Sequence, residues 1–202
     1  MNRDPGRTDG GSDNDRTLIR DFLSGNRSAF DRLLLRHKDR VFSLCYRFLG
    51  DYQEAEDSAQ DAFVKVYTSL KRFRFESSFS TWLYRIVFNT CMNKLNSLKY
   101  RFAKGSVSLK DLENRREGAQ EREIRDDGPT PAMELERKER MELIQEAINS
   151  LPPRQKVAVI LRDIQGLSYE EIADITGWNI GTIKSRIARA RLGLRDRLRG
   201  QI

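Results

Sequence analysis

The sequence is poor in the side chains that metal and redox sites require. Its 202 residues include one histidine, His37, and two cysteines, Cys45 and Cys91, which have no CxxC spacing. A metal site is therefore not predicted, and no cofactor is expected. Because both cysteines fall within apolar helical patterns, they are predicted to be buried free thiols. His37 is predicted to lie on the surface of a helix.

Long apolar runs are also missing. No stretch approaches the roughly 18 apolar residues that a membrane-spanning helix needs, and residues 1–16 lack the apolar region of a signal peptide. A composition of 38% hydrophobic and 33% charged residues predicts a soluble protein with a packed core and no direct membrane insertion.

The net charge of +7 is concentrated in two blocks. Residues 17–98 carry 13 basic and 9 acidic side chains, residues 136–202 carry the same numbers, and residues 99–135 carry 8 of each. A basic excess indicates an acidic partner such as nucleic acid, although many basic proteins bind none.

The spacing of apolar residues predicts an all-α fold with two small helical domains joined by a flexible linker. Residues 17–98 show helical spacing without competing strand-like alternation, and helical spacing resumes over residues 136–202. Residues 1–16, rich in Gly, Asp, Asn and Arg, are predicted to form a disordered tail. Residues 99–135 contain few large apolar side chains and end in DDGPTPA, which predicts the linker.

The second domain contains a helix-turn-helix pattern. Ser168 and Glu171 have the spacing of a capping box, and Gly177 suits the left-handed turn that follows the first helix. The outward face of the second helix holds side chains suited to phosphates and base edges in the major groove: Thr182, Lys184, Ser185, Arg186 and Arg189. An ordinary helical hairpin with a solvated basic face is the alternative. The capping box, the turn glycine and the charge bias together favour DNA binding.

An acidic helix is predicted in the first domain, in the segment DYQEAEDSAQDAF. Asp57, Gln60, Asp61 and Val64 share one face of it, at positions i, i+3, i+4 and i+7. A solvated surface is the simplest interpretation, but the face also suits a basic protein partner and would repel DNA. An enzyme site fits poorly, because no nucleophile or metal-binding histidine accompanies the carboxylates.

Six of the 18 aromatic residues fall in the segment FRFESSFSTWLYRIVFNT, residues 73–90. Poor helical spacing over 72–79 predicts a loop, and a helix is predicted from about Ser80. Rings mixed with Arg and Ser in a loop suit unstacked single-stranded bases, whereas core burial is the commonest fate of any Phe. The core is predicted to take the following side chains: Leu83, Ile86, Val87 and either Tyr84 or Phe88.

Together, the segments AEDSAQDAFVKVY, FSTWLYRIVFNT and LPPRQKVAVILRDIQGLSYEEIADITGWNIGTIKSRIARAR resemble bacterial sigma factors of the extracytoplasmic-function class. The resemblance covers residues 17–98 and 136–199. It implies a dissociable, non-enzymatic subunit that gives RNA polymerase its promoter specificity in transcription initiation, in a stress or envelope response. Asn179 stands where relatives often have proline, a change that a helix start tolerates.

The resemblance also implies three sites. Docking on the coiled coil of the polymerase beta-prime subunit is implied for the acidic face: Asp57, Gln60, Asp61 and Val64. Capture of a flipped minus-ten base is implied for the loop and the helix behind it: Phe75, Ser77, Ser78, Phe79, Trp82, Arg85 and Asn89. Reading of the duplex minus-thirty-five element is implied for the helix-turn-helix, which is also held by the beta flap: Thr182, Lys184, Ser185, Arg186 and Arg189.

Family members are commonly restrained by an anti-sigma factor. The resemblance therefore implies a protein of the bacterial cytoplasm, or one held at the inner membrane by such a factor. Two alternatives come from other classes. A stand-alone helix-turn-helix regulator would bind duplex DNA tightly as a dimer, but no dimerisation coiled coil is evident. A nucleic-acid-processing enzyme would need a metal or nucleophile constellation, and none is found.

Overall fold

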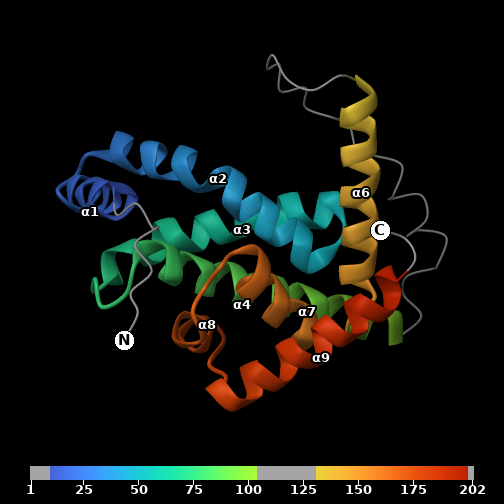
Figure 1. Cartoon of the computed structure of the whole chain (residues 1–202). Helices are drawn as coiled ribbons and strands as arrows, with labels where there is room; N and C mark the ends of the chain where they lie inside the picture. Colours follow the sequence, from blue (N-terminus) through green and yellow to red (C-terminus); the bar gives the residue numbers. More distant parts are fainter. Residues whose placement is uncertain (1–9, 104–130, 200–202) are drawn as a thin grey trace.

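The computed structural model describes residues 10–103 and 131–199, and every regular element in these residues is helical (Figure 1). The all-α prediction is confirmed. The helices are, in order, α1 (Gly10–Leu23), α2 (Arg27–Leu49), α3 (Tyr52–Ser69), the 3-10 turn η1 (Leu70–Arg72), α4 (Phe79–Ala103), α6 (Pro131–Asn149), α7 (Pro153–Val159), the π-helical turn η3 (Ile160–Ile164), α8 (Tyr169–Thr176) and α9 (Ile180–Leu198). No helix of the described residues has the length and apolar character needed to span a membrane.

Helices α2, α3 and α4 form the first half, with α1 packed against α2. Gly50 ends α2 in the left-handed conformation, at φ 77°, and its backbone N–H donates to the carbonyl of Tyr46. Asp51 then caps α3, because its carboxylate accepts from the backbone N–H of Glu54 at 2.8 Å. This tight corner turns the chain so that α3 returns along α2.

The second half is built from α6, α7, α8 and α9. Ser168 and Glu171 form the predicted capping box, and Gly177 adopts the predicted left-handed conformation at φ 70°. The side chain of Asn179 accepts from the backbone N–H of Thr182 at 2.8 Å. Asn179 therefore caps α9, which agrees with the prediction that a helix start tolerates this residue.

The N-terminal helix begins earlier than the sequence predicted. It starts at Gly10, inside residues 1–16, and only residues 1–9 of the predicted tail lie outside the described residues. Asp15 is buried, with one carboxylate oxygen 2.9 Å from His37 Nε2 and the other 3.0 Å from an Arg36 nitrogen. The prediction of a surface position for His37 is wrong, because its ring is buried between this carboxylate and the ring of Phe79.

Both ends of the predicted linker also carry helix. Helix α4 runs on to Ala103, and α6 begins at Pro131, so each extends into residues 99–135. Residues 104–130 of that segment lie outside the described residues.

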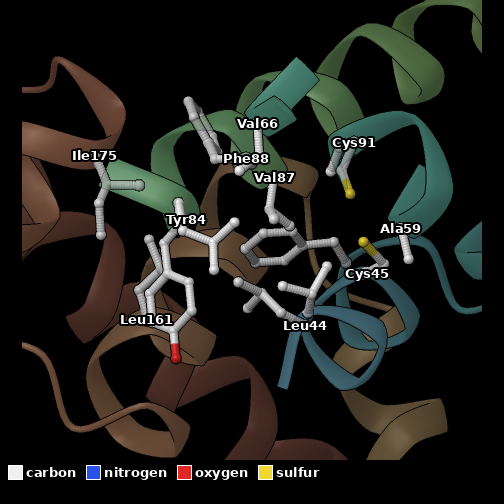
Figure 2. Packing of buried hydrophobic residues seen from close by; sticks show 14 of the residues in the cluster. Leu44, Cys45, Ala59, Val66, Tyr84, Val87, Phe88, Cys91, Leu161 and Ile175 are labelled. Atoms are coloured by element: carbon white, nitrogen blue, oxygen red, sulfur yellow. The ribbon is translucent and has the colours of Figure 1, made fainter. Parts of the chain in front are cut away.

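The two halves share one hydrophobic core. Helix α8 packs against α4, and α2 contacts both α6 and α7. Leu161 and Ile175 of the second half belong to the same buried cluster as Tyr84 and Phe88 of the first (Figure 2). The helix-turn-helix is thereby placed against the helix that follows the aromatic loop.

The two cysteines are buried free thiols, as predicted. Figure 2 shows the side chains of Cys45, on α2, and Cys91, on α4, pointing toward one another. The hydrogen bond with Cys45 is the main cause that raises the pKa of the Cys91 thiol, and burial of the thiol raises it further. Both side chains therefore act as small apolar core residues.

Candidate nucleic-acid interfaces

Helix α9 presents most of its predicted DNA-facing side chains to solvent. Lys184, Ser185 and Arg189 are exposed, and Thr182 and Arg186 are half-buried. The opposite face of α9 is fixed by the fully buried Ile183, Ile187 and Ala190. The helical period therefore orients the polar face, and substitutions of its exposed residues, Lys184, Ser185 and Arg189, leave the core of the hairpin untouched.

Two cations of this face lie over aromatic rings: Lys184, whose Nζ is 5.4 Å from the centre of the Tyr169 ring, remains exposed, whereas Arg186 is half-buried. Its guanidinium carbon lies 3.9 Å from the centre of the Trp178 ring, within the range of a cation–π contact. Its Nη1 is buried and has no hydrogen-bond partner among the described residues. This burial, together with the charge of Arg154, lowers the pKa of Arg186. In turn, the Trp178 ring meets the ring of Phe88 edge to face at 5.8 Å.

The aromatic loop, residues 73–78, is held at both ends by buried rings. Phe73 and Phe79 lie 6.0 Å apart between ring centres, and the Trp82 ring packs against both. Phe79 is only 6% exposed. Its ring therefore belongs to the core and has no free face for a base, unlike the role implied by the resemblance.

Phe75 and Ser78 have different local roles in this loop. Phe75 is half-buried and adopts a left-handed backbone at φ 59°, which is unfavourable for a bulky side chain. Its ring packs on the Phe73 ring, with 4.8 Å between the ring centres. Ser78 Oγ accepts from the backbone N–H of Thr81 at 3.0 Å, so this hydroxyl caps the first turn of α4.

A pocket of about 500 Å³ opens beside the loop. Three of the predicted minus-ten residues line it, namely Ser77, Trp82 and Arg85, whereas the exposed Asn89 lies outside its lining. The other lining residues were not predicted: Arg72, Phe73, Arg74, Glu76, Thr81 and Asp174. The arginines on either side of Phe73 in the sequence could have indicated that Arg72, Phe73 and Arg74 line the pocket. Asp174 could not be found, because it comes from α8 in the other half.

The pocket combines positive charge with ring faces. The guanidinium groups of Arg72, Arg74 and Arg85 outnumber the two carboxylates of the lining, of which Glu76 lies 4.0 Å from Arg74, and two rings supply apolar walls. Stacking on a ring together with ionic contact to a phosphate is the usual way in which proteins hold single-stranded nucleic acid. The pocket therefore has the chemistry to hold one unstacked nucleotide.

The acidic face of α3 is exposed to solvent. Asp57, Gln60, Asp61 and Val64 are all exposed, and Val64 retains 64% of its accessible surface. The opposite face packs small residues into the core, with Ala55 and Ala62 fully buried. Asp57 lies 3.9 Å from Lys94, so it is partly screened, while Asp61 is in no ion pair among the described residues. An exposed apolar side chain within an acidic patch suits a basic protein partner.

Comparison with known proteins identifies the family. The family model for sigma-70 region 2 matches residues 33–101, and the model for sigma-70 region 4 matches residues 141–194. The chain is 37% identical over 189 residues to the RNA polymerase sigma-H factor of Pseudomonas aeruginosa, covering 88% of this chain and 90% of that protein. It is also 37% identical to the ECF RNA polymerase sigma-E factor of Escherichia coli K12, with coverages of 88% and 90%. The chain belongs to the extracytoplasmic-function (ECF) sigma factors.

This ECF sigma factor is therefore a non-enzymatic specificity factor that directs transcription initiation, as its sequence predicted. Among solved structures, RpoE from Bartonella quintana, in complex with the anti-sigma factor NepR, superimposes with a TM-score of 0.65 at 25% identity, covering 86% of this chain and 98% of that one. CnrH, in complex with the cytosolic domain of CnrY, has a TM-score of 0.60 at 24% identity and covers 92% and 97%. The latter likeness supports the fold.

The region 2 match contains both the acidic face of α3 and the aromatic loop of the sigma factor. The region 4 match contains α7, α8 and most of α9. The two polar faces and the pocket thus fall within the two matched family regions, while α1 lies outside them.

Proposed function

We propose that this sigma factor docks on core RNA polymerase through α3 and recognises a promoter at two separate elements. The proposal rests on one observation above all: an acidic face, an arginine-lined pocket and a basic helix face are built from three separate sets of residues, on α3, around the aromatic loop and on α9. Acidic side chains suit a protein surface, and the two basic sites suit DNA. One chain can therefore contact polymerase and promoter at the same time.

The docking site consists of the four exposed residues on one face of α3: Asp57, Gln60, Asp61 and Val64. Their partner is the beta-prime coiled coil implied by the family resemblance, and the beta flap holds the second half. Val64 supplies an apolar contact that desolvates on binding, and the carboxylates fix the orientation of the partner.

The minus-ten site is the pocket beside the aromatic loop. Trp82 provides ring surface in the pocket, Arg85 provides charge, and Ser77 provides a hydroxyl for a base edge. Phe75 is outside the lining and adds a second ring beside the pocket, where it packs on Phe73. Phe79 and Ser78 act indirectly, as the packing support and the helix cap already described. Arg72 and Arg74 are additional phosphate contacts.

The minus-thirty-five site is the polar face of α9, in the major groove. Lys184, Ser185 and Arg189 are available in the present arrangement, and Arg186 joins them once it leaves Trp178. Residues 17–98 and 136–202 act as two domains, and residues 99–135 connect them. Because both domains bind one promoter, two weak contacts give one selective complex.

An anti-sigma factor is the proposed negative regulator. RpoE of Bartonella quintana has been solved with the anti-sigma factor NepR, and its fold matches most of this chain. A partner of the same kind, free or anchored at the inner membrane, would restrain this sigma factor until a stress or envelope signal releases it.

The test is in vitro transcription from a genomic library with core polymerase, with and without the sigma factor. We expect new start sites that share spaced upstream elements near minus ten and minus thirty-five. Start sites without shared upstream elements would contradict promoter recognition. Tight binding of the free protein to a palindromic duplex, without polymerase, would instead support a stand-alone regulator.

A further inference from the structure

The pocket beside the aromatic loop takes one side chain from the other half of the chain. Asp174, on α8, lines it together with side chains that all fall within residues 72–85. Asp174 itself is exposed, but its helical neighbours Ile172 and Ile175 are buried, and Ile175 belongs to the common core (Figure 2). The core therefore fixes the position of this carboxylate at the pocket, on a helix that packs against α4.

Opposite charges line this pocket without pairing with one another. Within the described residues, the Asp174 carboxylate makes no ion pair or hydrogen bond, and neither do the guanidinium groups of Arg72 and Arg85. Arg74 lies 4.0 Å from Glu76, at the outer limit of an ion pair, and both side chains are largely exposed. A ligand with hydrogen-bond donors at one end and negative charge at the other would give partners to both kinds of group.

The same pocket offers ring surface. The half-buried Trp82 ring is fixed by two neighbours, with 5.1 Å between its centre and that of Phe73 and 5.9 Å between its centre and that of Phe79. Nucleobases stack on a ring held in this way. The volume of about 500 Å³ lies within the roughly 300–1,000 Å³ typical of small-molecule sites. Ring, charge and volume together suit a free nucleotide.

A carboxylate at such a site discriminates among the bases. It has two acceptor oxygens and no donor. Guanine presents two adjacent N–H donors on its Watson–Crick edge, at N1 and at N2. Adenine, cytosine and uracil each place a donor next to an acceptor on that edge, so one carboxylate oxygen would face a lone pair. Guanine is therefore the base that can donate to both oxygens of Asp174 at once.

We propose that this pocket binds a free guanine nucleotide that carries two or more phosphates. The guanine stacks on Trp82 and donates to Asp174, and the phosphates lie among the guanidinium groups of Arg72, Arg74 and Arg85. Three guanidinium groups match a diphosphate or triphosphate better than the single phosphate of a monophosphate or of one step in a DNA strand.

This binding requires neither DNA nor polymerase, so it goes beyond the proposed function and can fail or hold separately from it. Trp82 and Arg85 are also proposed minus-ten contacts, so a bound nucleotide would compete with the promoter strand for them. That consequence alone rests on the proposed function.

The first test is isothermal titration calorimetry of the full-length protein with GDP, ADP, guanosine and the DNA trinucleotide TGT. We expect GDP to bind about tenfold more tightly than ADP, at the lower end of what a bidentate contact gives. Guanosine, which lacks phosphates, should bind about tenfold more weakly than GDP. Equal affinities for GDP and ADP, or no measurable binding of GDP, would overturn the proposal. Tighter binding of TGT than of GDP would assign the site to a strand and would also overturn it.

A matched pair of variants tests the role of the carboxylate. Asp174→Asn and Asp196→Asn each remove one negative charge from an exposed position in the second half, but only Asp174 lines the pocket. The readout is the ratio of GDP affinity to ADP affinity, because a change in net charge affects both nucleotides alike. We expect Asp174→Asn to lower this ratio from about ten to about one and Asp196→Asn to leave it unchanged. A ratio that Asp174→Asn does not lower would contradict the guanine contact.

Fluorescence tests the stacking. Trp82 and Trp178 are the two tryptophans of the sequence, so Trp178→Phe leaves Trp82 as the single emitter. We expect GDP to quench this emission over the same concentrations at which it binds. A folded variant that shows no quenching at saturating GDP would refute the stacked base. The wild-type calorimetry stands whatever this substitution does to the fold.

Discussion

Helix α9 and the aromatic loop position their proposed DNA contacts by opposite means. On α9, the buried Ile183 and Ile187 fix one face, and the polar residues on the other face carry no part of the core. In the loop, Phe73 and Phe79 are buried, and the candidate contact residues Phe75 and Ser77 lie between these two rings in the sequence. Binding and stability can therefore be changed separately on α9, whereas in the loop they are coupled.

The largest expected effect tests this coupling at the end of the loop. Phe79→Ala removes a buried ring that packs on Phe73, Trp82 and His37, so we expect the free energy of unfolding to fall by about 3–5 kcal/mol. Chemical denaturation monitored by circular dichroism gives the value. A loss below about 1 kcal/mol would show that Phe79 is not a core residue.

Phe75→Ala tests DNA binding by the aromatic loop, whereas Phe79→Ala tests its stability. We expect capture of single-stranded minus-ten DNA to weaken by about 1–3 kcal/mol, the value of one stacked base, with a smaller effect on duplex binding. Anisotropy with matched single-stranded and duplex probes, taken from a promoter found by transcription, measures both. Equal losses on the two probes would remove Phe75 from the pocket assignment.

Arg186→Ala sharpens the α9 side of the comparison. We expect minus-thirty-five binding to weaken by about 1–3 kcal/mol if the residue contacts a base, while the thermal stability of the chain changes little. Arg195→Ala, on the exposed end of the same helix, is the matched control. A loss of the same size on every upstream sequence would make Arg186 a phosphate contact.

Lys156 is a basic residue of the second half that, unlike the exposed basic residues of α9, is buried. It is 6% exposed, has no carboxylate partner among the described residues, and burial lowers its pKa to about 8. Because the folded state releases this proton at lower pH than the unfolded state, stability should rise with pH, by about 2 kcal/mol between about pH 7.5 and pH 9.5. Denaturation of the wild type and of Lys156→Met at both values measures it; an equal rise in both proteins would assign the effect to other groups.

Asp61→Lys should have the smallest effect. Asp61 is exposed on α3, as the polar residues are on α9, so its substitution changes a surface contact and leaves the core intact. We expect association with core polymerase to weaken about tenfold, or ~1.4 kcal/mol, with the fold unchanged. Asp39→Lys, at an exposed position on α2, is the control in a co-purification or interferometry assay. Equal losses for both variants would indicate a general charge effect.

Local patterns in the sequence predicted the helices, the capping box and the polar face of α9, because each depends on residues within a few positions of one another. The pairing of Asp15 with His37 across 22 residues of chain had no local signal. The roles of Phe75 and Phe79 could not be separated either, since helical spacing fails in the loop. Asp174 reaches the pocket only through the packing of α8 on α4.

The buried thiols have a practical consequence for following this molecule in solution. Cys45 and Cys91 are the only cysteines in the sequence, and neither exposes any surface. Maleimide reagents attack accessible thiolates, so the native chain should react slowly while it stays folded. A cysteine placed on an exposed position of α3 and another on α9 could then carry a fluorescent donor and acceptor without removal of the native pair.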